Sequence, residues 1–373
     1  MRGLSLAGVL VANLLFSFRE PMSVAYLGAD RARPFADRFA EALVQFAIQG
    51  KAITLFSVLF GAGLAIQAER FARFGRAEPW LARRLVVLLA VGLAHLTLFW
   101  NGDILTEYAL GGLLVLPMLQ ARVRTLAAVA AALYALSIAI PLTPWVSWPD
   151  DAALLREIED ATRIYGDGSW LEIRGYSLHE WRIFSPLPYT VFTATPALML
   201  LGILSWRCGW WHVARRPARA LAIVAATGMG AGLLLTAIAA SDARYNAVLP
   251  AYVAGCLAPV VLAAGYAAFI LRVLDAGLLR RACALAAAAG RMAFTNYLVQ
   301  TLVFTTLFYG YGLGLMGEMG AATALAGGIA GYVLQCVASR MWLARFRFGP
   351  MEWAWRSLTY GRRQPFLRRS AQG

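Results

Sequence analysis

The feature that most constrains this chain is a series of apolar stretches, each roughly 18 to 25 residues long and separated by short basic or turn-forming segments. A lipid core of about 30 Å is crossed by about 20 residues of α-helix. Backbone polar groups must pair internally in lipid, and the alternating pattern of a membrane β-barrel is absent. The pattern therefore predicts an all-α polytopic integral membrane protein.

Composition favours the same class. Of the 373 residues, 60% are hydrophobic and 14% are charged, whereas about 25% of a soluble domain is charged. So few charges cannot cover an aqueous surface. We expect a single transmembrane domain over residues 1–373 with about ten transmembrane helices, at 3–18, 47–69, 81–100, 103–120, 123–141, 187–206, 218–240, 247–271, 291–311 and 321–343.

The basic residues predict the orientation. If the amino terminus is cytoplasmic, 24 of the 34 basic residues fall in cytoplasmic segments. By the positive-inside rule we expect both termini in the cytoplasm of a bacterium and the chain in its inner membrane. The charge lies at helix ends rather than on one soluble face, so we expect no nucleic-acid partner.

Two segments outside the predicted helices have distinct compositions. Residues 142–186 form an acidic, tryptophan-rich extracytoplasmic loop, which is interpreted either as a helix lying on the membrane surface or as a substrate-binding loop. Residues 344–373 form a basic cytoplasmic tail, for which anionic membrane lipids are the expected partners. The four cysteines have no C-x-x-C spacing, so we expect no disulfide and no metal site.

A first group of polar residues is predicted in the outer half of the membrane, where ionisable groups are candidates for function. His95 could act as a base, and Asp103 and Glu107 share one helical face at i,i+4 spacing. Such a set suits general acid–base work on a hydroxyl or an amine. A structural interpretation is also open: Asp103 as a helix cap, Lys51 and Glu107 as an ion pair, and His95 bonded to a carbonyl. Asn13 and Lys51 belong to the same predicted layer and are candidate substrate- or donor-binding residues.

A second group is predicted at the cytoplasmic side, at the inner ends of two helices. Arginines at such positions commonly reach toward lipid phosphate, and they could equally hold the phosphate of a cytoplasmic donor. The candidate donor-binding residues are Arg2, Arg291, Asn296 and Gln300. Small-xxx-small spacings at Gly228/Gly232, Gly310/Gly314 and Gly327/Gly331 predict closely packed helices.

Several blocks of sequence resemble the YeiB-like family of bacterial inner-membrane proteins, whose function is unknown. The blocks are Arg2-Gly3 with 8–13, 55–63, His95 with 100–105, 290–301 and 346–359. The family in turn resembles a superfamily of membrane acyltransferases, in which an acyl group moves from cytoplasmic coenzyme A to an acceptor across the membrane. That resemblance rests on Arg2, Gly3 and Asn13.

Two departures from these patterns matter. An Asp that precedes Arg-Gly in the family has no counterpart here, which is consistent with a truncated start. The His that follows the first helix in the acetyltransferases is also missing, because residues 14–50 contain none. If acyl transfer occurs, His95 must therefore be the base.

Three functions are open from the sequence. The first is an acyltransferase that uses acyl-CoA or a similar donor, with a lipid or an envelope glycan as acceptor. The second is a proton-coupled transporter or exporter of a small molecule, which buried carboxylates would suit. The third is a scaffold whose buried charges only specify helix packing.

Overall fold

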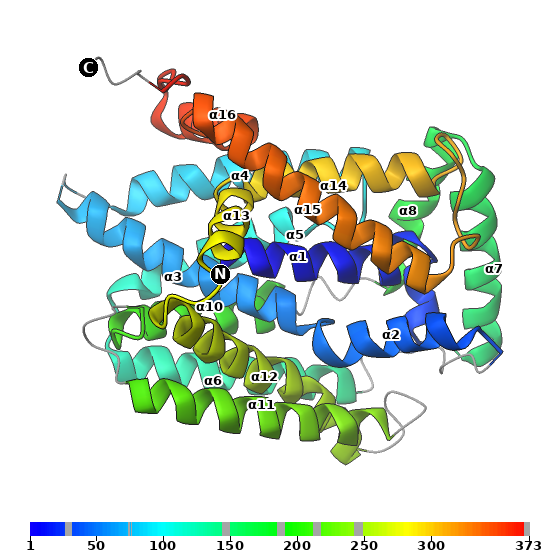
Figure 1. The fold of residues 1–373 in the computed structure, drawn as a ribbon, viewed down its shortest axis with the longest axis horizontal. Coiled ribbons are helices and arrows are strands. Elements are labelled where there is room, and N and C mark those ends of the chain that lie inside the picture. Colours follow the sequence, from blue (N-terminus) through cyan, green and yellow to red (C-terminus); the bar gives the residue numbers. More distant parts are fainter. Residues whose placement is uncertain are drawn as a thin grey trace.

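The computed structural model describes residues 1–26, 32–73, 75, 77–143, 150–184, 191–211, 218–241 and 249–368. Every regular element in these ranges is a helix, apart from one isolated β-bridge between Phe346 and Leu367. The predicted all-α class is confirmed. Most of the long helices run in the same direction or its reverse, as in a bundle (Figure 1).

The elements follow each other along the chain with short connections. Those of the amino-terminal half are α1 (Arg2–Asn13), a π-helical turn η1 (Leu14–Phe18), η2 (Met22–Tyr26), α2 (Phe35–Ala47), α3 (Lys51–Ala72), α4 (Glu78–Leu98), α5 (Ile104–Val115), η3 (Leu116–Gln120), α6 (Val123–Ala139) and η4 (Ile140–Leu142). Those of the carboxy-terminal half are α7 (Asp151–Asp167), α8 (Trp170–Phe184), α10 (Ala194–Arg207), α11 (Ala218–Ala240), α12 (Leu249–Asp275), α13 (Arg280–Arg291), α14 (Ala293–Phe308), α15 (Ala321–Arg345) and α16 (Pro350–Tyr360).

Six helical segments of the described chain are long and apolar enough to cross a membrane: Phe35–Ala72, Glu78–Leu98, Val123–Leu142, Ala218–Ala240, Leu249–Asp275 and Ala321–Arg345. Helices also occur at the other predicted positions, but they are shorter. Arg2–Phe18 and Ile104–Gln120 are short apolar helices, and α10 and α14 have 14 and 16 residues. The structure therefore supports a membrane protein with about six long spans, and the count of ten stays a prediction.

The outer faces of these helices are apolar. On α15, Leu334 and Met341 are each 69% exposed and Ile329 is 53% exposed. Similar large apolar side chains are exposed on α11, among them Leu234 at 62%. Apolar faces of this extent are unfavourable in water and match hydrocarbon, so lipid is the natural surrounding of the bundle.

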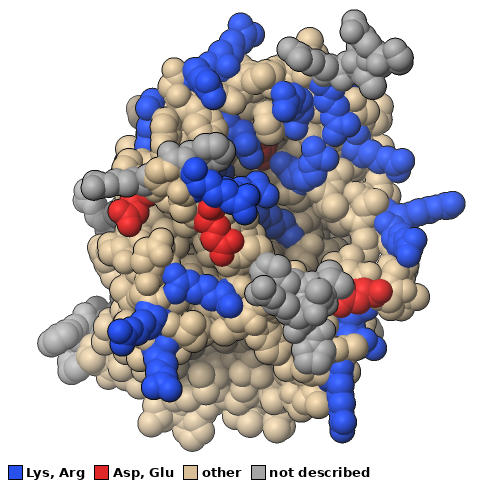
Figure 2. Space-filling view, turned by 90° about the vertical axis from the view of Figure 1, so that its left-hand side faces the viewer, with Lys and Arg blue, Asp and Glu red and all other residues tan. Residues whose placement is uncertain are grey.

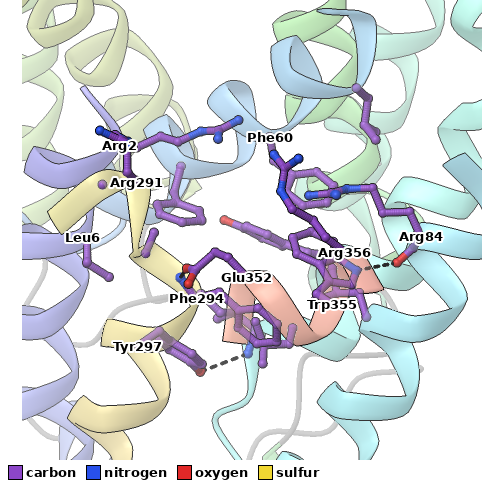
Figure 3. A pocket seen from close by; sticks show the side chains of 18 of the residues that line it. Arg2, Leu6, Phe60, Arg84, Arg291, Phe294, Tyr297, Glu352, Trp355 and Arg356 are labelled. Atoms are coloured by element: carbon purple, nitrogen blue, oxygen red, sulfur yellow. Dashed lines mark hydrogen bonds between the residues drawn. The ribbon is translucent and has the colours of Figure 1, made fainter. Parts of the chain in front are cut away.

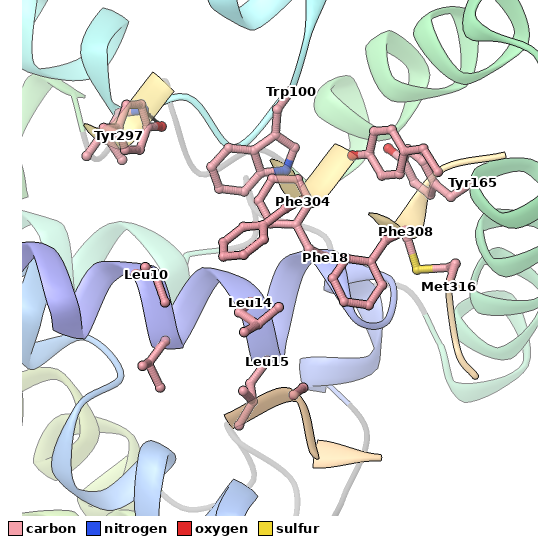
Figure 4. Packing of buried hydrophobic residues seen from close by; sticks show 14 of the residues in the cluster. Leu10, Leu14, Leu15, Phe18, Trp100, Tyr165, Tyr297, Phe304, Phe308 and Met316 are labelled. Carbon is pink, nitrogen blue, oxygen red and sulfur yellow. Dashed lines mark hydrogen bonds between the residues drawn. The ribbon is translucent and has the colours of Figure 1, made fainter. Parts of the chain in front are cut away.

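Helix α1 and η1 lie at the centre of the molecule (Figure 1). Phe18 packs against Trp100 and Phe304, with ring centroids 4.5 and 5.2 Å apart. Figure 4 shows this aromatic contact, with Leu10 and Leu14 along the same helix. The core thus joins the first helix to the α4–α5 turn and to α14.

The region predicted as an extracytoplasmic loop contains α7 and α8, which pack against each other at one end of the bundle. Trp170 Nε1 donates a hydrogen bond to the Leu98 carbonyl at the end of α4. Two of the tryptophans in the predicted loop, Trp145 and Trp148, lie outside the described residues. The region predicted as a tail contains α16 near the opposite end, packed against α4 and α14.

Candidate functional site: a buried histidine beside a basic pocket

His95 lies in the last turns of α4 and is 3% exposed. Its Nδ1 is 2.8 Å from Asp103 Oδ1, and its Nε2 is 3.0 Å from Thr301 Oγ1 on α14. With Nδ1 donating to the carboxylate, Nε2 is left to accept from the Thr301 hydroxyl, which also lies 3.4 Å from the Tyr297 carbonyl. A carboxylate, an imidazole and a hydroxyl in this order form the relay used to activate hydroxyl nucleophiles.

Asp103 also begins α5. Its Oδ1 accepts from Leu105 N at 3.1 Å and its Oδ2 from Thr106 N at 2.7 Å. The side chain therefore caps the helix, as one interpretation of the sequence predicted, and it orients His95 at the same time. Gly92 allows this arrangement, because a Cβ at that position would lie 2.5 Å from Thr106 N.

The other predicted residues of this group form no hydrogen bond with His95. Glu107 accepts a hydrogen bond from Thr195 on α10, and Lys51 donates to the Gln45 carbonyl at 3.0 Å. No ion pair joins Lys51 to Glu107, so that interpretation of the two residues is wrong. Asn13 is half-buried at the junction between α1 and the π-helical turn.

A pocket of about 190 Å³ opens near the α16 end of the bundle. Four arginines line it, contributed by α1, α4, α13 and α16. They are Arg2, Arg84, Arg291 and Arg356. In Figure 3, Arg2 approaches from one wall, and Arg84 and Arg356 approach from the other. None of the four forms an ion pair with a carboxylate of the described chain, so the pocket suits a phosphate or another anion.

Glycines explain how α1 and α13 bring Arg2 and Arg291 together. A Cβ at Gly3 would lie 1.8 Å from the Ala286 carbonyl, and one at Gly290 would lie 2.5 Å from Gly3 N. A Cβ at Gly63 would lie 2.6 Å from a guanidinium nitrogen of Arg2. Side chains at these three positions would push the two helices and the guanidinium apart.

Helix α16 supplies the second wall of the pocket. The Arg84 guanidinium lies 3.5 Å from the centre of the Trp355 ring, and Trp355 Nε1 donates to the Arg84 carbonyl at 2.8 Å. Glu352 accepts from Phe294 N at 2.8 Å and from Thr295 Oγ1 at 2.6 Å, so it caps the start of α14. Burial raises the pKa of the Glu352 carboxyl. No pattern in the sequence indicated that α16 closes the pocket.

The deep end of the pocket reaches the neighbourhood of the histidine. Ile104, Leu105 and Tyr297 line it there. Tyr297 Oη accepts a long hydrogen bond of 3.4 Å from Ile104 N, and its ring centroid is 5.4 Å from that of His95. His95 and Asp103 therefore stand directly behind the residues that end the pocket.

Two further predicted donor-binding residues lie outside the pocket. Asn296 Nδ2 donates to Ser339 Oγ at 3.0 Å, and Gln300 Nε2 donates to Gln335 Oε1 at 2.9 Å. Both bonds join α14 to α15. These side chains hold two helices together in the membrane, where side-chain hydrogen bonds stabilise helix association.

Thr301, Arg84 and Arg356 were not singled out from the sequence. Thr301 belongs to a block that resembles the family, and its spacing from Tyr297 could have placed both on one helical face. Arg84 was counted only as cytoplasmic charge, and Arg356 also belongs to a block that resembles the family.

The fold and the site define a class: a helical membrane protein in which a basic pocket leads from one end of the bundle toward a buried His–Asp pair. Residues 205–362 match the model of a family described as a protein of unknown function, DUF418. Along 99% of its length the chain is 33% identical to the uncharacterized protein YxaH of Bacillus subtilis (strain 168), covering 95% of that protein.

Over 100% of its length the chain is 31% identical to the uncharacterized protein YeiB of Escherichia coli (strain K12), covering 98% of it. An uncharacterized 39.9 kDa protein of Bacillus acidopullulyticus is 27% identical over 98% of the chain and 94% of its own length. The chain belongs to the YeiB-like family, DUF418. No solved structure matches it significantly.

Proposed function

We propose that this protein is an acyltransferase of the bacterial inner membrane, which takes an acyl group from a cytoplasmic donor and gives it to a lipid or envelope-glycan acceptor on the other side. The observation that carries the proposal is the basic pocket, which is lined by four arginines and by Tyr297. The Tyr297 ring lies against the imidazole of the His95–Asp103 pair.

In this proposal the basic end of the bundle faces the cytoplasm. Figure 2 shows that end, where Lys and Arg greatly outnumber Asp and Glu. Positive charge of this kind is retained on the cytoplasmic side of a membrane. The α7–α8 end then faces outward, and the ten helices form ten spans with both termini inside.

The donor is an acyl thioester that carries phosphate groups, such as acyl-CoA. Arg2, Arg84, Arg291 and Arg356 would bind the phosphates, because guanidinium groups bind phosphate oxygens in a bidentate manner. The apolar walls of the pocket, with Phe60 and Leu88, would receive the acyl chain and its linker.

His95 acts as the general base. The acceptor hydroxyl takes the place of the Thr301 hydroxyl at Nε2, and its oxygen attacks the thioester carbonyl carbon. The proton moves to Nε2, the C–S bond breaks, and the protonated imidazole returns the proton to the departing thiolate. The Asp103 carboxylate keeps Nδ1 protonated and stabilises the imidazolium.

The experiment uses the purified full-length protein and tritiated coenzyme A. We expect saturable binding that falls about tenfold or more in Arg84→Gln, because one charge-assisted contact is lost. Arg122→Gln, an arginine outside the pocket, is the control and should bind as the wild type does. Absence of binding to the wild type would overturn the donor assignment.

A His95→Gln variant tests the chemistry separately. It should bind coenzyme A normally and lose acyl transfer by about 10² to 10⁴-fold. Thr301→Val distinguishes activation of the acceptor hydroxyl by His95 from activation of the Thr301 hydroxyl by His95. Direct transfer to the acceptor predicts that Thr301→Val stays active, whereas an acyl group carried on Thr301 predicts an inactive variant and an acylated wild type in intact-protein mass spectrometry.

The transporter hypothesis gains no specific support from the contacts. It requires a carboxylate on the substrate path, but Glu107 does not line the basic pocket and is bonded to Thr195. Glu352, the carboxylate that does line the pocket, is held by its hydrogen bonds to the start of α14. Proton-coupled flux in proteoliposomes that disappears in Glu107→Gln would favour the transporter over the enzyme.

A further inference from the structure

A second buried polar site is formed by residues of α7, α8 and the α4–α5 turn. Figure 1 shows α7 and α8 at the end of the bundle away from α16, the helix that lines the basic pocket. The members of this second site are Asn101, Tyr165, Arg174, Ser177 and Glu180, each at most 8% exposed, and we refer to them as the Arg174 cluster.

Some hydrogen bonds of the cluster are complete. Glu180 Oε2 accepts from Tyr165 Oη at 2.6 Å and from Asn101 Nδ2 at 2.8 Å. Asn101 Nδ2 also lies 3.3 Å from the Ser177 carbonyl. These bonds hold Glu180 against the α4–α5 turn at Asn101, which is two residues before Asp103.

Apart from an interaction between Arg174 and the Tyr309 hydroxyl, the remaining polar atoms of the cluster have no hydrogen-bond partner within the described chain. The unpaired donors are Nε, Nη1 and Nη2 of Arg174, and the unpaired acceptors are Oε1 of Glu180 and Oδ1 of Asn101. The Ser177 hydroxyl is also unpaired and can donate or accept a hydrogen bond. Buried polar groups are nearly always paired, and a buried charge without a partner costs stability. So many unpaired polar atoms in one cluster indicate a ligand-binding site.

The charges decide which chemistry fits. An anion would suit Arg174 but would lie beside the Glu180 carboxylate. A cation would suit Glu180 but would meet the Arg174 guanidinium. Neutral hydroxyl groups suit both, because a hydroxyl accepts from a guanidinium and donates to a carboxylate or an amide oxygen.

Flat aromatic surfaces complete the site. The Arg174 guanidinium lies 5.9 Å from the centre of the Tyr309 ring, and that ring stacks on Tyr165 with centroids 5.0 Å apart. Aromatic faces offer apolar contact to the C–H groups that stand between the hydroxyls of a polyol.

We infer that the Arg174 cluster is a binding site for vicinal hydroxyls, as found in a sugar or in the glycerol head group of a lipid. The inference rests on the proposed function in one respect: the hydroxyls belong to the acceptor, which the cluster holds next to the α4–α5 turn that carries Asp103. Arg174 and Glu180 are positioning residues here, and neither enters the transfer step.

Binding is tested with the full-length protein in a detergent without sugar or glycerol groups. One arm adds glucose and detects saturation transfer by NMR. The other compares nanodiscs of phosphatidylglycerol and phosphatidic acid by native mass spectrometry, because both lipids are anionic and only the first has a glycerol head group. We expect wild type to bind glucose or to select phosphatidylglycerol, and the arm that responds identifies the source of the hydroxyls. If neither arm responds, the cluster holds water at most and the inference is overturned.

Substitutions separate a binding site from a structural one. Arg174→Lys keeps the charge but not the guanidinium fork, and Arg174→Met removes the charge at similar length. We expect both to weaken binding by about 10- to 100-fold. Arg174→Met should change the thermal midpoint little, since it removes a buried charge that forms no ion pair but also removes the cation near Glu180.

The matched control is Arg163→Met. Arg163 lies on α7, 66% exposed and paired with Asp160 at 3.0 Å, and it should bind as wild type does. A lower thermal midpoint in Arg174→Met together with unchanged binding in Arg174→Lys would overturn the inference. Coenzyme A binding is measured in parallel: its absence would refute the proposed donor and leave hydroxyl binding standing.

Discussion

At the scale of single residues, one carboxylate serves two purposes. Asp103 accepts two backbone hydrogen bonds at the start of α5 and one hydrogen bond from His95. Fixing the base to a helix terminus makes its orientation depend on the helix itself. Glu352 at the α16 end is similarly placed, because it caps α14 and also lines the pocket beside the arginines.

Asp103→Asn should separate the two purposes. An asparagine still caps a helix but carries no charge to stabilise an imidazolium, so acyl transfer should fall by about 10² to 10⁴-fold with a small change in thermal midpoint. Asp103→Ala should lose both, with a further cost of about 1 to 2 kcal/mol in the free energy of unfolding. Equal activity in Asp103→Asn and wild type would refute the role of the charge.

Glu180 should make stability depend on pH. Burial raises the pKa of its carboxyl above the unfolded value, while hydrogen bonds from Tyr165 and Asn101 oppose the shift. The nearby charges are Arg174, which opposes the shift, and Glu157 on α7, which adds to it. Between the two pKa values the folded chain holds the extra proton, so its stability is greatest below the unfolded pKa and falls as pH rises through the folded pKa.

Glu180→Gln cannot ionise and should not show this fall. Thermal midpoints measured from pH 4 to pH 8 should therefore differ most between the two proteins at the high end, with the variant more stable. Parallel curves would show that Glu180 does not titrate differently in the folded chain.

At the scale of helices, glycines decide which pairs can approach closely. A Cβ at Gly61 would lie 2.0 Å from the Met199 carbonyl, and one at Gly202 would lie 2.0 Å from the Val58 carbonyl, so α3 and α10 cross backbone to backbone. The predicted pair Gly228/Gly232 does the same between α11 and α12. Gly327 and Gly331 face open space on α15, and Gly310 and Gly314 lie after α14.

The same substitution at two glycines should have opposite effects. Gly61→Ala forces a Cβ against a carbonyl oxygen and should lower stability by about 1 to 3 kcal/mol. Gly327→Ala meets no atom within 4 Å and should raise it by about 0.5 to 1 kcal/mol, since alanine favours the helix. Thermal midpoints in one detergent measure both. A similar loss at the two positions would show that Gly327 packs against something, such as a second copy of the chain.

At the scale of the whole molecule, the two polar sites lie toward opposite ends of the bundle. The basic pocket lies beside α16, and the Arg174 cluster lies under α7 and α8. The His95–Asp103 pair stands between them on the α4–α5 connection. A reaction that joins a cytoplasmic donor to an external acceptor would need this order.

Labelling of single cysteines in a cysteine-free background tests the orientation. Arg163→Cys on α7 should react with a membrane-impermeant maleimide in intact cells, whereas Arg362→Cys, just after α16, should react only after permeabilisation. Both positions are exposed, so access depends on the side of the membrane. The reverse pattern would invert the proposed direction of transfer.

The sequence by itself determined the class of fold. Each apolar stretch specifies a helix because its backbone hydrogen bonds are satisfied within the segment, and the polar residues inside those stretches marked His95, Asp103, Arg2 and Arg291 as candidates. The predicted depth of each residue in the membrane follows from successive helices crossing it in alternating directions. The prediction of a polar layer therefore needed no knowledge of how the helices pack.

Only the tertiary structure decided which of those residues meet. His95 contacts Thr301, which is 206 positions away along the chain. Lys51 and Glu107 form hydrogen bonds with other partners and not with each other. Lateral neighbours depend on how helices rotate and pack, which no local pattern records. The Arg174 cluster is the clearest case. An arginine in an acidic segment is typical of a surface charge, and only the structure shows that Arg174 is buried near Glu180 with unpaired polar atoms around it.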